Sequence, residues 1–358
     1  MPVFESESIQ QVALHRVGNQ ATQEGIVLSE CLLQLSDQLQ DLLINYFITP
    51  FKVEEYYHFY HDDNLELNDL YRHASHIFED PECLLEESRA IAKLLYDKCN
   101  HPSIKGGDLF VVYFSSALVN GITTSAIGLF KSENKDSFLK VVHGDENWSR
   151  ESGNDSATTT YHLEVHQGIN IKKLDKGALI FNTEAENGYL VSVVDATNRT
   201  TDAAYWKDAF LQIRQRHDDF FKTNEVMRAT KQFVTQTMPD VFEMTKADEA
   251  EFLNKSMEYF KNNDSFEMED FARDVLGQPD IIDSFTEFKQ TYEKENEVEI
   301  PEQFDINETA VKKQSRAYKS VIKLDKNFHI YVHGDRQLIE QDEDEKGKYY
   351  KIYYKEES

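Results

Sequence analysis

The sequence predicts an α+β fold: an N-terminal antiparallel sheet with flanking helices, then a helical region ending in a small antiparallel β-sheet. Short β-rich runs follow one another from about residue 109 to residue 196 with no helical pattern between them, which is typical of antiparallel pairing. From about residue 204 the apolar spacing becomes helical, and alternation returns only after residue 320. We therefore expect two domains, residues 1–203 and 204–358.

The first domain is predicted to open with a strand over residues 9–18, followed by a helix over residues 28–47. In that helix six apolar residues recur at steps of four and three, and Ser29 is a candidate N-cap. Such a stripe suits either the core of the domain or a dimer seam, and both uses stay open. A second helix is expected over residues 84–99, because Pro102 follows it.

The predicted sheet continues in six short runs that are separated by turn signals. Asn187-Gly188 is a dipeptide that favours a two-residue type I′ hairpin turn. The runs cover residues 109–116, 124–132, 138–144, 159–167, 177–183 and 188–196.

The second domain is predicted to be helical and then to end in strands. Between Asp240 and Glu308 it holds twenty-one acidic and six basic residues, a net charge of −15. The expected helices cover residues 205–221, 246–263, 268–277 and 281–297, and the expected strands cover residues 320–324, 328–334 and 349–355.

Composition narrows the class of protein. Hydrophobic residues make up 40% of the chain, which is enough for a sizeable core and excludes a disordered protein. Three scattered cysteines are not a disulfide framework, no apolar run approaches the roughly 20 residues of a membrane span, and the start lacks a signal peptide. These features predict a protein of the reducing cytoplasm. Its net charge of −27 opposes attraction to nucleic acid or anionic membranes, so any DNA contact must be local.

The sequence contains no nucleophile elbow, no phosphate-binding glycine loop and no H-E-x-x-H zinc pattern. A Ser/His/Asp set scattered along the chain stays open, because triads are defined by geometry. The pairs His58/His61 and His73/His76 would each share a helix face, either as metal ligands or as surface histidines. His162, Glu164 and His166 would share one strand face. We expect no metal and no cofactor.

A basic segment, residues 309–336, stands out against the acidic chain. From Lys312 to Arg336 it has seven Lys/Arg against two Asp, a local charge of +5. On a helix that ends before Lys323, its cations would form one stripe, and alternation then predicts a small sheet. The residues expected to face the core of that sheet are Ile322, Leu324, Phe328, Ile330 and Val332.

Cations interleaved with aromatic side chains suit a nucleic-acid backbone, and the last strand has this pattern too. The candidate DNA-binding residues are Lys312, Lys313, Arg316, Lys319, Lys323, Lys351 and Tyr353. In one alternative these cations neutralise the acidic block of residues 240–308 across an interface. In another, the lysines lie on an edge strand and prevent it from pairing with another chain.

Four stretches carry a resemblance along nearly the whole chain: VALHRVG, KGGDLFVVYF, AIGLFKSENKDSFLKV and VKKQSRAYKSVIKLDKNFHIYVHGD. With them the sequence resembles the bacterial nucleoid-associated protein family of the YejK/NdpA type, and most of all its Bacteroidetes-like branch. The resemblance implies a cytoplasmic, nucleoid-located protein that binds DNA and self-associates as a homo-oligomer. It also implies contact with DNA-handling enzymes such as a type II topoisomerase, with no catalytic residues and no cofactor.

Two functions follow. In the first, a non-enzymatic nucleoid-associated protein contacts DNA phosphates through the basic segment. In the second, the acidic helices make the chain a protein–protein adaptor that reaches the nucleoid through a DNA-handling enzyme. A hydrolase or nuclease built on the His and Asp clusters is a third alternative.

Overall fold

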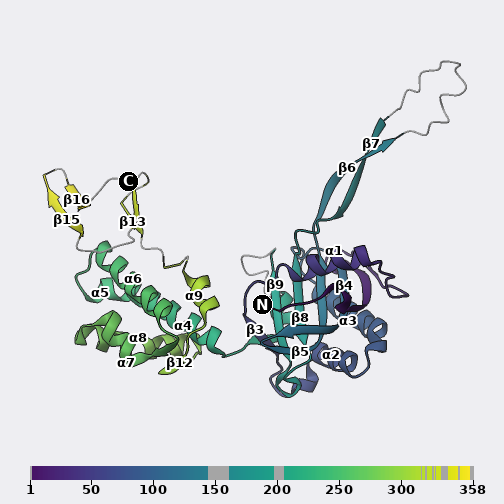
Figure 1. Cartoon of the computed structure of the whole chain (residues 1–358), viewed down its shortest axis with the longest axis horizontal. Helices are drawn as coiled ribbons and strands as arrows, with labels where there is room; N and C mark the ends of the chain where they lie inside the picture. Colours follow the sequence, from purple (N-terminus) through teal and green to yellow (C-terminus); the bar gives the residue numbers. More distant parts are fainter. Residues whose placement is uncertain are drawn as a thin grey trace, which may run out of the picture. The chain divides into compact units, whose positions relative to one another are not determined.

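Figure 1 shows a computed structural model of the chain, which divides into two compact units, Met1–Gln215 and Arg216–Ser358. The predicted α+β fold is confirmed. The structure describes residues 2–143, 161–196 and 205–354, except Arg316, Lys319, Ser320, Asp325, Asn327, residues 332–337, Lys346 and the side chains of His143, Val321 and Lys323.

The first unit is built on an eight-stranded sheet in the order β10-β3-β9-β8-β5-β4-β1-β2, and every neighbouring pair is antiparallel. The predicted antiparallel sheet is therefore confirmed. Its strands are β1 (Ile9–Val17), β2 (Ile26–Val27), β3 (Tyr56–Phe59), β4 (Gly107–Val119), β5 (Ile122–Ser132), β8 (Lys176–Phe181), β9 (Leu190–Asp195) and β10 (Ile213–Gln215).

Helices cover both faces of this sheet, because its strands alternate buried side chains toward two cores. Within β1, Ala13 joins the core under α2 (Asp69–Glu79) and α3 (Leu84–Lys98), whereas Val12 joins the core under α1 (Asp37–Ile48). The predicted helix over residues 84–99 is thus confirmed to within one residue.

The helix predicted over residues 28–47 is half wrong. Residues 28–36 are not helical, because their backbone is tied to β1: Leu33 N–H donates to Val12 O and Ser29 N–H donates to His15 Nδ1. The helix α1 begins only at Asp37, and its N-cap is Ser36, not Ser29. The leucine spacing was therefore a false helical signal in its first half.

The helix predicted over residues 205–221 is also wrong in its centre. A π-helical turn, Tyr205–Leu211, buries Trp206 in the first core, and β10 then pairs with β3 at the sheet edge. These residues therefore belong to the first unit, and the next helix starts after the N-cap Asp218.

The β8–β9 connection is longer than the expected two-residue turn. A short 3₁₀ turn, Ala185–Asn187, precedes Gly188, whose φ of +91° is in the left-handed region. The strands β6 (Lys135–His143) and β7 (Tyr161–Ile169) pair with each other in a separate two-stranded ribbon, which stands away from the sheet in Figure 1.

The second unit packs helices around an aromatic core that includes Phe233, Phe260, Phe266, Phe271 and Phe285. Helices at residues 246–262 and 279–296 confirm two of the predicted ones, while the third is a short α-helix continued by a π-helical turn, Ala272–Leu276. The helices are α4 (Asp219–Gln232), α5 (Met238–Val241), α6 (Lys246–Asn262), α7 (Met268–Phe271), α8 (Pro279–Asn296) and α9 (Glu308–Gln314). A further π-helical turn covers Phe233–Thr237.

Small antiparallel hairpins complete this unit, and the acidic strand β15 was not predicted. Ile322 is buried as expected, but Leu324 and Phe328 are 46% and 63% exposed, so their assignment to the core is wrong. They lie beside the turn that joins β13 and β14, where no second layer covers them among the described residues. Val332 lies outside those residues. The strands are β11 (Ser265–Glu267), β12 (Gln303–Asp305), β13 (Val321–Lys323), β14 (His329–Tyr331), β15 (Ile339–Asp344) and β16 (Gly347–Ile352).

Candidate nucleic-acid interface

The helix that was expected to carry the basic stripe is short. Asn307 caps α9 by accepting from the backbone N–H of Ala310 at 3.0 Å, and the helix ends at Gln314. Beyond it the chain turns so that buried Tyr318 donates a hydrogen bond to Met227 O in the core.

The prediction of one long helical stripe is therefore wrong, because α9 ends before its later positions. Arg316 and Lys319 follow the helix and lie outside the described residues. Lys323 lies in β13, and its side chain is outside the described part as well.

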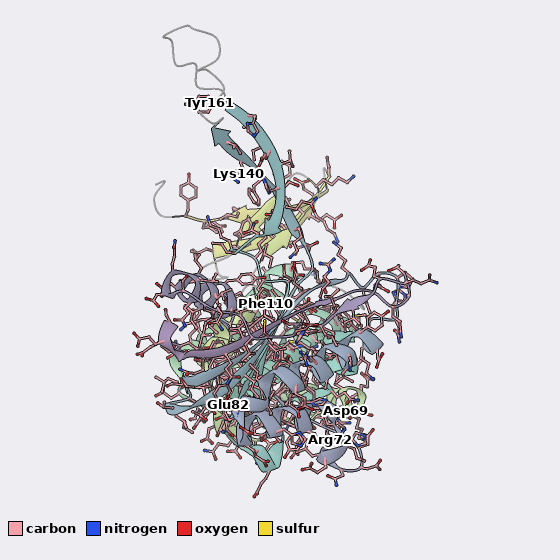
Figure 2. All side chains as sticks on the ribbon, turned by 90° about the vertical axis from the view of Figure 1, so that its right-hand side faces the viewer. Asp69, Arg72, Glu82, Phe110, Lys140 and Tyr161 are labelled. Atoms are coloured by element: carbon pink, nitrogen blue, oxygen red, sulfur yellow. The ribbon has the colours of Figure 1, made fainter. Side chains whose placement is uncertain are left out.

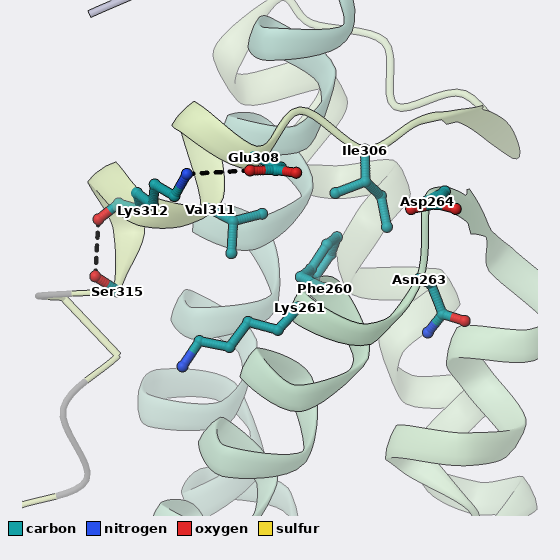
Figure 3. Close-up of a pocket in the computed structure, with 9 residues that line it drawn as sticks. All are labelled: Phe260, Lys261, Asn263, Asp264, Ile306, Glu308, Val311, Lys312 and Ser315. Atoms are coloured by element: carbon teal, nitrogen blue, oxygen red, sulfur yellow. Dashed lines mark hydrogen bonds and ion pairs between the residues drawn. The ribbon is translucent and has the colours of Figure 1, made fainter. Parts of the chain in front are cut away.

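Lys312 lies at the rim of a pocket of about 480 Å³ between α6 and α9. Figure 3 shows its Nζ directed toward Glu308 Oε2, at 3.0 Å, with Lys261 at the same pocket. The neighbouring Lys313 has its Nζ 5.2 Å from the centroid of the Phe220 ring. Both members of the Lys312–Glu308 pair are largely exposed, and such a pair is worth at most about 1 kcal/mol, so a phosphate could compete with Glu308.

The C-terminal candidates share one carboxylate. Lys351 Nζ lies 3.7 Å from Glu340 Oε2, and the Tyr353 hydroxyl donates to the same oxygen at 3.0 Å. Glu340 belongs to β15, which also carries Asp342 and pairs with β16. A phosphate approaching this hairpin would therefore meet carboxylates beside the cations.

A second group of lysines lies in the first unit, and sequence reasoning missed it. Four exposed lysines line one pocket of about 580 Å³, here called the lysine pocket. They come from three segments: the turn after α1, the loop before β4, and the connection from β7 to β8. They are Lys52, Lys105, Lys172 and Lys173.

None of these four ammonium groups pairs with a carboxylate in the part of the chain that the structure describes. The pocket also contains the carboxylates of Asp175 and Glu133, but both already accept hydrogen bonds from other groups. Asp175 accepts the backbone N–H groups of Glu133 and Asn134, at 2.6 and 2.9 Å. Glu133 Oε1 accepts from Lys131 Nζ at 3.0 Å and from the Tyr205 hydroxyl at 2.8 Å. Lysines outnumber carboxylates in this pocket by four to two, and Glu133 is already paired with Lys131, so the pocket keeps a net positive charge.

The family model of the nucleoid-associated protein YejK matches residues 13–349 of this chain. The chain belongs to the nucleoid-associated protein YejK family. No curated protein matches it. The expectation drawn from the resemblance is thus confirmed at the level of the family.

In this YejK-family chain a buried polar network holds the floor of the lysine pocket. Lys131 and Lys176 are both buried, and their Nζ atoms lie 5.4 and 5.2 Å from the centroid of the Tyr205 ring. Lys131 also donates to Lys105 O at 2.7 Å, and Lys176 pairs with Asp195 at 2.8 Å. Burial and the nearby Glu133 raise the pKa of Tyr205, which keeps its hydroxyl protonated. Through the bond from Lys131 to Lys105 O, the network holds the loop that carries Lys105.

The histidine pairs have structural contacts. His73 and His76 in α2 both bond to Glu87 of α3, at 2.5 and 3.0 Å. His58 lies in the strand β3, so its pair does not share a helix face as expected. On β7, Glu164 lies 2.9 Å from His166 and 3.7 Å from His162, which confirms their common face.

Within the described residues, no group of three or more His, Cys, Asp or Glu side chains is arranged to hold a metal ion. Among the helices in that same part of the chain, none combines the length and the apolar character that crossing a bilayer requires.

Proposed function

We propose that this chain is a non-enzymatic nucleoid-associated protein of the cytoplasm that contacts DNA phosphates directly. The observation that carries the proposal is the lysine pocket, where four exposed cations converge without carboxylate partners among the described residues. Lysines that meet phosphates release counterions, and this release drives sequence-independent DNA binding. In a chain with a charge of −27, such a local cluster is what lets one face approach DNA while the acidic faces turn away.

The basic segment is the second part of the proposed contact. Lys312 and Lys313 lie on its short helix, and Lys312 gives up only a weak exposed ion pair on meeting a phosphate. All the residues predicted from the sequence contribute to this contact. The pair at the C-terminal hairpin contributes least, because Glu340 competes with phosphate for it. The predicted residues are Lys312, Lys313, Arg316, Lys319, Lys323, Lys351 and Tyr353.

A pair of double variants tests the lysine pocket. Lys172→Gln/Lys173→Gln removes two unpaired cations, so we expect duplex DNA affinity at low salt to fall about tenfold. The matched control is Lys246→Gln/Lys255→Gln, which changes the net charge equally but removes lysines already paired with Glu249 and Glu251 on α6. Fluorescence anisotropy with a short labelled duplex measures both. Equal losses in the two variants would show that only overall charge matters, and would remove the pocket from the proposal.

A protein–protein adaptor is the second candidate, and one observation favours it. In the block from Asp240 to Glu308, basic residues such as Arg273 and Lys289 already pair with local carboxylates. Because twenty-one acidic residues face only six basic ones there, most of the negative charge is left for a basic partner. A DNA-handling enzyme such as a type II topoisomerase is the proposed partner. If the purified chain does not bind duplex DNA, the adaptor function is favoured over direct DNA contact.

We also propose that the chain is a homo-oligomer.

A further inference from the structure

The ribbon of β6 and β7 has two chemically different faces. Its register places Leu139 opposite Val165 and Val141 opposite Leu163, and alternation puts all four side chains on one face. The other face carries Phe138, Val142, the imidazoles of His162 and His166, and the charged pair Lys140–Glu164. Figure 2 shows the ribbon rising away from the sheet, with Lys140 and Tyr161 on it. One face is therefore aliphatic and the other mostly polar.

The aliphatic face lies open to solvent. Its four Leu and Val side chains are between 55% and 72% exposed, and Tyr161 at the end of the same face is 62% exposed. A two-stranded ribbon is only marginally stable alone in water, and soluble monomers rarely expose a contiguous apolar surface of this kind. Both facts indicate that this face is covered when the protein functions.

The net charge of the ribbon indicates which partner covers this aliphatic face. The described ribbon residues, 135–143 and 161–169, carry two lysines, one Asp and one Glu, so the ribbon is formally neutral while the whole chain is at −27. A neutral aliphatic surface offers no attraction to phosphate. A second copy of this chain would be repelled by most of the acidic surface but not by the ribbon.

The arrangement of the side chains is also self-complementary. Leu139 and Leu163 lie on one diagonal of the patch, and Val141 and Val165 lie on the other. When two such ribbons stack face to face about a two-fold axis that lies midway between them and runs parallel or perpendicular to the strands, each Leu lies opposite a Val of the copy. Large side chains then face small ones, which is how packed layers interdigitate, and a two-fold contact requires such self-complementarity.

We propose that the aliphatic face of this ribbon, defined by Leu139, Val141, Leu163 and Val165, is the contact through which two copies of the chain associate. The two ribbons stack as sheets do, about 10 Å apart. The inference rests on the self-association proposed above and names its surface. It is independent of the DNA contact.

Two neighbouring substitutions on one strand test the proposal. Leu163→Glu places a carboxylate on the aliphatic face, whereas His162→Glu places the same group on the opposite face. Sedimentation velocity of the full chain over a range of micromolar concentrations gives the dimer dissociation constant. We expect wild type and His162→Glu to be dimers, and the dissociation constant to rise at least tenfold in Leu163→Glu. Circular dichroism shows whether each variant is folded.

Two outcomes would overturn the proposal, and they can be told apart. A wild-type chain that stays monomeric throughout the range would remove self-association together with its surface. A wild-type dimer that Leu163→Glu leaves unchanged would remove only the surface. A second substitution on the same face, Val165→Glu, must agree with Leu163→Glu.

Discussion

At the scale of single residues, the first unit holds a histidine that burial keeps neutral. His15 in β1 is 1% exposed; its Nδ1 accepts from the Ser29 N–H at 3.0 Å and its Nε2 donates to Ser88 Oγ at 2.9 Å. Burial, with Arg89 nearby, lowers the pKa of His15 to about 4. The same contact with Ser29 holds residues 28–36 in their non-helical path. Charge on this ring would therefore disturb both the core and that segment.

The stability of the first unit should consequently fall as the pH drops from 7 to 5. Between pH 7 and pH 5, His15 of the unfolded chain, with a pKa near 6.5, becomes protonated, whereas His15 of the folded chain stays neutral. Because the unfolded state then binds more protons, lowering the pH shifts the equilibrium toward unfolding. The expected loss in free energy of unfolding is about 2 kcal/mol. His15→Gln should remove this loss, whereas the exposed control His101→Gln should keep it. Urea unfolding at the two pH values measures it, and an equal pH dependence in all three proteins would contradict the assignment.

At the scale of elements, the connection between β8 and β9 depends on one glycine. Gly188 has a φ of +91°, and its carbonyl accepts from Phe59 N–H of β3 at 2.8 Å. A Cβ at this position would lie 2.4 Å from Phe59 O. Gly121 in the β4–β5 turn has a similar φ of +77°, but a Cβ there would meet nothing within 4 Å.

These two glycines separate backbone strain from steric clash. Gly121→Ala should cost only the left-handed backbone penalty, about 1–2 kcal/mol. Gly188→Ala adds the clash with β3, so its total cost should reach about 3 kcal/mol or more. Thermal and urea unfolding of the two variants give the comparison. A smaller cost at Gly188 than at Gly121 would mean that the β3 contact is not as close as the structure shows.

The elements that sequence predicted correctly are those with strong local patterns. Strands such as β4 and β5 have buried alternating or continuous apolar runs, and α6 and α8 have clear apolar periods, so local sequence was enough. The helix predictions for residues 28–36 and Ile213–Gln215 were wrong because the backbone hydrogen bonds of these residues go to β1 and β3, which are distant in sequence. Tertiary pairing there overrode the helical spacing.

The candidate interface was only partly visible in the sequence, for the same reason. The basic segment is contiguous, so its charge could be counted directly. The lysine pocket collects Lys52, Lys105 and the pair Lys172-Lys173 from segments more than 50 residues apart, and only the sheet brings them together. The hydrogen bonds from backbone N–H groups to Asp175 and the ion pair of Glu133 with Lys131 could not be predicted from sequence either, because they depend on the folded chain.

At the scale of the whole molecule, the chain combines a large negative charge with membership of a nucleoid-associated family. Direct DNA binding then requires that a few clustered cations attract phosphate strongly enough to overcome the repulsion from the negative charge of the whole chain. Such binding should be strongly dependent on salt, because each neutralised phosphate releases counterions. The lysine pocket is proposed as the main source of these contacts, with the basic segment adding to it.

The most direct measurement of this claim is the affinity of the full chain for duplex DNA as a function of salt concentration. Four phosphate contacts at the lysine pocket contribute about −3.6 to the slope of log K against log salt. The variant Lys52→Gln/Lys105→Gln/Lys172→Gln/Lys173→Gln should therefore flatten that slope by about 3.6. A fourfold variant that keeps the wild-type slope and affinity would contradict the account, as would a wild-type chain that does not bind duplex DNA at low salt.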